Sequence, residues 1–84
     1  MALEKEVVEV LDTALGLRGR SAGFDRDTAL LGALPELDSM GVLNVITQVE
    51  ERFGISVQDD ALDASAFSTV GTLADWLAAQ LGRT

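Results

Sequence analysis

Three stretches of this sequence repeat apolar side chains every three or four positions, and this spacing limits the possible fold more than any other feature. The stretches are residues 3–15, 39–53 and 69–81. Such spacing places the apolar side chains along one side of an α-helix, whereas a half-buried strand would alternate them. Each stretch is followed by a glycine, a residue that commonly ends helices: Gly16, Gly54 and Gly82. We therefore expect three helices.

The middle stretch is rich in valine and isoleucine, so a strand is the competing interpretation. Its length and its spacing of three and four favour a helix. The expected apolar stripe, widened by Val42 and Val45, consists of Met40, Leu43, Ile46, Val49 and Phe53. In the last helix the corresponding stripe consists of Val70, Leu73, Leu77 and Leu81, with Ser68 or Thr69 as the cap.

The segment at residues 17–38 lacks sustained periodicity and contains three glycines and the only proline. A loop of this length is uncommon in a compact domain and is usually functional. We expect a short helical turn within residues 25–34, and a short helix at residues 64–67. The apolar residues of the loop should pack over the helices: Leu17, Phe24, Leu30, Leu31, Leu34 and Leu37. The predicted fold is all-α, a single domain over residues 1–84 forming a three-to-four-helix bundle with a long first loop.

Charge and composition exclude several classes of function. The chain has 84 residues and a net charge of −8, which argues against binding nucleic acid or an anionic membrane surface. A protein partner with a basic docking surface fits this charge, as does a simple contribution to solubility. There is no cysteine and no histidine, so no disulfide, no thiolate metal site and no Ser-His or Cys-His pair can form. We expect no catalytic residues, no metal ligands and no enzymatic activity.

The first seventeen residues are charged and amphipathic, and they lack the uncharged core of a signal peptide. No later stretch approaches the length and apolarity of a membrane span. We expect a cytoplasmic protein, and a monomer.

Ser39 stands between Asp38 and Met40 at the start of the middle helix. Either Asp38 or Ser39 could cap the helix, since both side chains accept hydrogen bonds from the free amides there. Neither residue has the glutamate or glutamine partner of a capping box, because the positions three residues on are Gly41 and Val42. An exposed hydroxyl at a helix N-terminus also suits a phosphate ester, because the helix dipole favours negative charge there.

The order of motifs resembles the acyl carrier protein family over nearly the whole chain. The matching strings are "LDSM" after a long first loop, "VEERFGI" at the end of the helix, and "FSTVGTLADWL" leading into the last helix. The resemblance implies that Ser39 carries 4′-phosphopantetheine, transferred from coenzyme A by a phosphopantetheinyl transferase that uses Mg²⁺. The thiol of that group would hold an acyl chain as a thioester, which explains how a chain without cysteine could serve thiol chemistry.

The resemblance also assigns roles to individual residues. Asp38 matches the aspartate before the attachment serine. The positions that would meet acyl ligases, synthases or acyltransferases through basic docking patches are Met40, Glu50, Glu51, Asp59 and Asp60. The positions that would line the core or an acyl pocket are Leu43, Ile46, Val49, Phe53, Leu62 and Leu73.

Three positions depart from the typical fatty-acid carrier. Gly41 and Asn44 stand where that carrier is acidic, and Arg52 interrupts the acidic run. These departures indicate a specialised pathway of lipid, polyketide or exopolysaccharide synthesis, and "LLGALPELDSM" resembles carriers of exopolysaccharide and exosortase-type gene clusters. "ELDSMG" also resembles the D-alanyl carriers, which leaves an aminoacyl cargo open. A small acidic adaptor, in which Ser39 is only a cap, is the alternative of another class.

Overall fold

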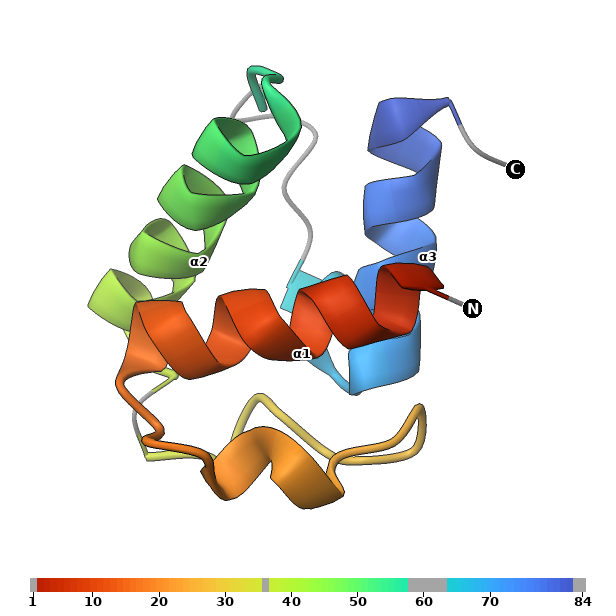
Figure 1. Ribbon diagram of the computed structural model, residues 1–84. Helices are drawn as coiled ribbons and strands as arrows, with labels where there is room; N and C mark the ends of the chain where they lie inside the picture. The colour runs from red at the N-terminus through yellow and green to blue at the C-terminus, as the bar shows by residue number, and fades with distance from the viewer. Residues whose placement is uncertain (1, 36, 58–63, 83–84) are drawn as a thin grey trace.

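The computed structural model describes residues 2–35, 37–57 and 64–82. Within these ranges, three α-helices and two short 3-10 helices follow one another in the order α1 (Ala2–Leu15), η1 (Arg20–Gly23), α2 (Ser39–Phe53), η3 (Ala64–Phe67) and α3 (Val70–Leu81). In Figure 1, α1 lies crosswise to α2 and α3, which stand on either side of it, and α1 packs against both. Among the described residues the only β-type pairing is an isolated antiparallel bridge between Ala29 and Thr69.

The predicted helices are confirmed, and their ends follow local chemistry. Gly54 and Gly82 close α2 and α3 in the left-handed conformation, which glycine adopts at little steric cost. Thr69 caps α3: its hydroxyl accepts from the amide of Thr72 at 3.1 Å, and the Thr72 hydroxyl accepts from the amide of Thr69 at 2.9 Å. The short helix expected at residues 64–67 is η3.

The core is aliphatic apart from Phe67, in keeping with the small number of aromatic residues. It is built by α1, the long loop, α2, η3 and α3, and its largest fully buried side chains include Leu11, Leu17, Leu30, Val45, Phe67, Leu73 and Leu77. Each such side chain contributes roughly 1.5–3 kcal/mol by leaving water. The long first loop is therefore part of the core, as predicted, because three of its leucines, Leu17, Leu30 and Leu37, are buried.

The predicted apolar stripe of α2 is confirmed in its later part and wrong at two positions near its start, Met40 and Leu43. The buried residues of α2 are Gly41, Val45 and Val49, which repeat every four positions, whereas Met40 is 63% exposed and Leu43 is 54% exposed. Apolar side chains surround the first turns of this helix, so the pattern alone does not fix which side faces α1. Ile46 and Phe53 are partly buried against the core.

Two predictions for the long loop are also wrong. Leu31 is exposed instead of packing over the helices. No helix forms within residues 25–34, and the short helix of the loop lies earlier, at η1. Instead, Asp25 closes a local turn, because its carboxylate accepts from the amide of Asp27 at 2.9 Å and its amide donates to the Thr28 hydroxyl at 2.9 Å. Such bonds between side chain and backbone compete with helix formation.

Backbone hydrogen bonds fasten the loop to the start of α3. The amide of Gly71 donates to the carbonyl of Arg26 at 2.9 Å, and the amide of Val70 donates to the carbonyl of Thr28 at 3.1 Å. These bonds satisfy amides that a helix N-terminus otherwise leaves without acceptors. Just before α3, the carbonyl of Ser68 accepts from the loop amide of Leu30 at 2.9 Å.

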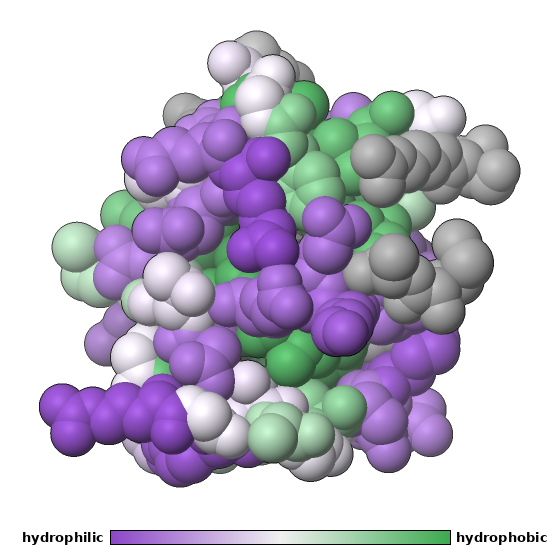
Figure 2. All heavy atoms as spheres, viewed as in Figure 1, coloured by the Kyte–Doolittle hydropathy of each residue, from purple (hydrophilic) through white to green (hydrophobic). Residues whose placement is uncertain are grey.

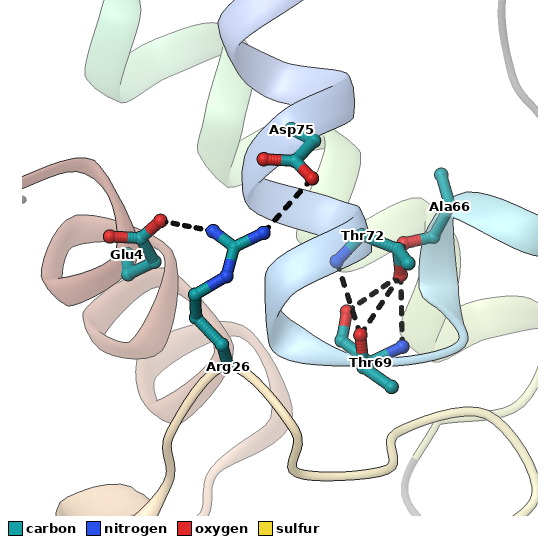
Figure 3. A network of polar contacts seen from close by, with 6 residues as sticks. All are labelled: Glu4, Arg26, Ala66, Thr69, Thr72 and Asp75. Atoms are coloured by element: carbon teal, nitrogen blue, oxygen red, sulfur yellow. Dashed lines mark hydrogen bonds and ion pairs between the residues drawn. The ribbon is translucent and has the colours of Figure 1, made fainter.

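The Arg26 side chain adds a polar link on the same side of the molecule. Figure 3 shows its guanidinium between Glu4 of α1 and Asp75 of α3, with Nη2 at 3.0 Å from the Asp75 carboxylate. The Asp75 hydrogen bond, followed by that of Glu4, raises the pKa of Arg26 above its ordinary value. Because Arg26 and Asp75 are largely exposed, the pairs orient the loop more than they stabilise the fold.

Candidate functional site

Ser39 is the first residue of α2, and its side chain is exposed. The cap of this helix is Asp38, whose Oδ1 accepts from the amide of Gly41 at 2.8 Å. Asp38 has extended backbone angles, as an N-cap requires, and its carbonyl accepts the first helical bond, from Val42, at 2.9 Å. Of the two residues considered as caps from the sequence, Asp38 therefore caps the helix and Ser39 does not.

This division of roles leaves the Ser39 hydroxyl available. None of the described residues forms a side-chain hydrogen bond with it. A capping function therefore does not account for the serine, because Asp38 already performs it. An exposed primary alcohol beside the free amides and the positive end of a helix can accept a phosphate ester.

The position of Ser39 is fixed from both sides. Leu37, two residues earlier, is buried, and its amide donates to the carbonyl of Leu34 at 3.0 Å. Gly41, two residues later, is buried where α2 packs into the molecule. The serine thus lies between two buried residues, and it is itself exposed.

A strip of exposed side chains runs along α2 from this point. We call Met40, Leu43, Asn44 and Thr47 the outward strip; they are spaced by three and four residues and all are exposed. Figure 2, viewed as Figure 1, shows apolar atoms at the surface on the left edge of the molecule, where α2 begins. Leu43, predicted for the core or an acyl pocket, therefore lies on the surface, because it is on the side of α2 opposite Val45 and Val49.

The acidic residues at the end of α2 differ from one another. The Glu50 carboxylate is partly buried and accepts from the amide of Val57 at 2.8 Å, so it holds the chain that follows the helix. Glu51 is exposed. Arg52 pairs with Glu9 of α1. Of the two docking glutamates predicted in α2, Glu51 is exposed, whereas Glu50 bonds the backbone that follows the helix. The other two acidic docking positions that were predicted, Asp59 and Asp60, lie outside the described residues.

The positions predicted to line the core or an acyl pocket do not share one environment. Val49 and Leu73 are buried, while Ile46 and Phe53 are partly buried against the core. Leu62 lies outside the described residues.

An open groove of about 460 Å³ lies between η3 and α3, and no feature of the sequence predicts it. It is lined by Ser65, Ala66, Ser68, Thr72, Asp75 and Trp76. Among the residues that the structure describes, no predicted site residue lines this groove, so the groove is separate from the serine site.

Sequence reasoning also missed the role of Asp12. Its Oδ2 accepts from the Ser21 hydroxyl at 2.6 Å and from the amide of Gly19 at 2.9 Å. These bonds, that of Ser21 first, lower the pKa of the Asp12 carboxyl. The only signal in the sequence was a carboxylate near the end of a helix followed by a glycine-containing turn, which is too common to single out. This contact holds the turn between α1 and η1.

Other kinds of site find no support in the part of the chain that the structure describes. Within residues 2–35, 37–57 and 64–82, no three acidic side chains gather as they would to hold a metal ion. Over the same ranges, no helix is both long and apolar enough to cross a membrane.

Comparison with known proteins gives two findings. The sequence model of the family described as "Phosphopantetheine attachment site" matches residues 5–77. Among solved structures, the chain is similar to the solution NMR structure of a holo acyl carrier protein from Nitrosomonas europaea, with 41% sequence identity and a TM-score of 0.88. The similarity covers 98% of this chain and 99% of that one.

Proposed function

The chain belongs to the acyl carrier protein family, the proteins with a phosphopantetheine attachment site, and on this premise we propose that Ser39 is the residue that carries 4′-phosphopantetheine. One observation supports this assignment above the others: Asp38 caps α2, which leaves an exposed serine at the helix start whose hydroxyl bonds none of the residues that the structure describes. The chain is a carrier and not an enzyme, so the residues that break and form bonds belong to its partners.

The attachment step uses the Ser39 hydroxyl as the nucleophile. Its Oγ forms a bond to the phosphorus that bears the pantetheine of coenzyme A, the bond from that phosphorus to the leaving oxygen of 3′,5′-ADP breaks, and the hydroxyl proton passes to a base of the transferase. Asp38 orients the serine by capping the helix, and its carboxylate is a group that could help to hold the Mg²⁺ that the transferase uses. Once bound, the group supplies the thiol that the chain itself lacks.

We also propose an acyl cargo, delivered in a specialised pathway in the cytoplasm. The support is that Gly41 and Asn44 are neutral at positions where a typical fatty-acid carrier is acidic. The partners would be a phosphopantetheinyl transferase and enzymes that load or use the acyl group. A D-alanyl cargo is the alternative. In that case the carrier would accept an amino acid from an adenylating ligase, and this loading would identify the cargo.

The test is intact mass spectrometry of the purified protein before and after incubation with coenzyme A, Mg²⁺ and a broad-specificity phosphopantetheinyl transferase. We expect a gain of one phosphopantetheine in the parent and in Ser68→Ala, whose serine is also exposed, and no gain in Ser39→Ala. A gain in Ser39→Ala would place the group on another residue. No gain in the parent with several transferases would leave the adaptor as the better description.

A further inference from the structure

We infer that the open groove between η3 and α3 is a second interaction surface, and that it binds an arginine side chain from an extended basic segment of a partner protein. The Asp75 carboxylate binds the guanidinium in this arrangement, and the Trp76 ring packs against its flat face. The inference goes beyond the proposed function, because no predicted site residue that the structure describes lines the groove. It does not depend on the modification of Ser39.

The first support is that contacts within the chain already give the groove its shape. The Thr72 hydroxyl of α3 donates to the carbonyl of Ala66 in η3 at 2.9 Å, and Figure 3 shows this bond joining the two walls. The long loop supports the segment between η3 and α3, because the Leu30 amide donates to the carbonyl of Ser68 at 2.9 Å. A surface that is formed in advance binds a partner with little cost of ordering.

The second support is the charge of the groove. Asp75 is the only charged residue that lines it, and its side chain is 69% exposed, so a partner can reach it. This carboxylate already binds one guanidinium, because Nη2 of Arg26 donates to its Oδ2 at 3.0 Å, while no described residue donates a hydrogen bond to its Oδ1. A carboxylate accepts several hydrogen bonds, so Oδ1 can bind a second guanidinium. The net charge of −8 also attracts a basic segment and repels an acidic one.

The third support is the tryptophan next to this carboxylate. Trp76 follows Asp75 in the sequence and lines the same groove, with its ring partly buried against the core. An arginine packs its planar guanidinium on an indole ring, and this attraction adds to that of the nearby carboxylate. The ammonium group of lysine is more strongly hydrated and has no flat face, so lysine fits this pair of residues less well.

The openness of the groove and its hydroxyl groups favour a segment of polypeptide over a small molecule. Sites for small molecules bury most of the ligand surface, which an open groove does not. Ser68 is exposed, and no described residue forms a hydrogen bond with its hydroxyl, which can therefore bond a backbone group of the partner. The Thr72 hydroxyl is already used within the chain, so a partner can cover it without leaving its proton unsatisfied.

The test follows the fluorescence of Trp76, the only tryptophan, while the unmodified full chain is titrated with tetra-arginine amide. We expect a saturable change in emission, and binding of tetra-lysine amide that is weaker by about threefold. Asp75→Asn should weaken the binding of tetra-arginine roughly fivefold, because hydrogen bonds to a neutral amide are weaker than those to a carboxylate. The matched control is Glu51→Gln, which removes the same charge from an exposed position on α2 and should change this binding less than about twofold.

Amide chemical shifts of the parent chain locate the bound peptide without any substitution, and the largest changes should fall on Ser68, Thr72 and Asp75. Because Asp75 is largely exposed, Asp75→Asn should leave the melting temperature nearly unchanged. Equal weakening by Asp75→Asn and Glu51→Gln, or equal binding of the two basic peptides, would show a diffuse attraction to an acidic chain and overturn the inference. Shift changes confined to α2, or no change in emission and shifts at millimolar peptide, would overturn it as well. The mass gain at Ser39 is measured separately, so the proposed function stands or fails independently of these results.

Discussion

Gly71→Ala tests the contact between the long loop and α3. A Cβ at this position would lie 3.0 Å from the carbonyl oxygen of Arg26 and 3.1 Å from its Cζ and Nη2 atoms. The guanidinium can move aside, but the carbonyl belongs to the backbone and accepts from the amide of Gly71 itself at 2.9 Å. The loop therefore cannot shift away without lengthening that hydrogen bond.

The expected change in the free energy of unfolding comes from three opposing contributions. Alanine gains up to about 1 kcal/mol of helix propensity over glycine. Crowding of the loop costs roughly 1–3 kcal/mol, and weakening of the hydrogen bond to Arg26 costs a further 0.5–1.5 kcal/mol or so. The crowding decides the sign, and we expect a net loss of about 2 kcal/mol, which lowers the melting temperature by roughly 8–16 °C in a domain of this size.

Urea unfolding followed by far-UV circular dichroism measures this difference, and fluorescence of Trp76, the only tryptophan, gives a second probe. The matched control is Gly23→Ala, because a Cβ at Gly23 meets no heavy atom within 4 Å and its φ is not in the left-handed region. This control should be neutral or stabilising by up to about 1 kcal/mol, because alanine restricts the unfolded chain. Equal stability of the two variants would refute the reasoning. Full relief of the loss by an added Arg26→Ala would show that the side chain, and not the carbonyl, causes it.

Three further predictions concern the site and its surroundings. Asp38→Ala should lower the free energy of unfolding by about 1 kcal/mol through loss of the cap, whereas Ser39→Ala should leave it nearly unchanged; equal losses would contradict the division of roles between the two residues. Glu50→Gln should cost roughly 0.5–1 kcal/mol, because its bond to the following backbone loses its charge, and Glu51→Gln should stay within about 0.5 kcal/mol in the same urea titration. The pKa of the Asp12 carboxyl is lowered in the folded state, so the stabilisation from this group is present above the unfolded pKa of about 3.9 and is lost as pH falls through the folded pKa. Asp12→Asn should therefore reduce the loss of unfolding free energy that accompanies acidification. An unchanged loss in the variant would show that Asp12 does not contribute to it.

The sequence predicted the helices well because their ends carry strong local signals. Glycines in the left-handed conformation close α2 and α3, and Thr69 and Asp38 cap them, all within the range of a few residues that pattern reasoning can examine. The buried side of α2 depended instead on where α1 lies. With apolar residues on several sides of its first turns, periodicity could not decide between the stripe through Leu43 and the one through Val45.

The motif predicted where the site lies, but it did not predict which side-chain atoms form hydrogen bonds there. Sequence reasoning located the serine at the helix start, but it could not say which of two adjacent side chains bonds the Gly41 amide. It also treated Glu50 and Glu51 as equivalent, since nothing local shows that the chain after the helix returns to the Glu50 carboxylate. Contacts between residues distant in the sequence, such as Arg26 with Gly71, have no sequence signal for the same reason.

The most direct test of the account is to locate the modification within the chain. Tryptic cleavage after Arg26 and Arg52 releases residues 27–52, in which Ser39 is the only serine and Thr28 and Thr47 are the only other hydroxyl residues. Tandem mass spectrometry of this peptide, after treatment of the protein with coenzyme A and a phosphopantetheinyl transferase, should place one phosphopantetheine on Ser39 and none on the threonines. A modified protein whose peptide 27–52 stays unmodified, or carries the group on a threonine, would contradict the central claim.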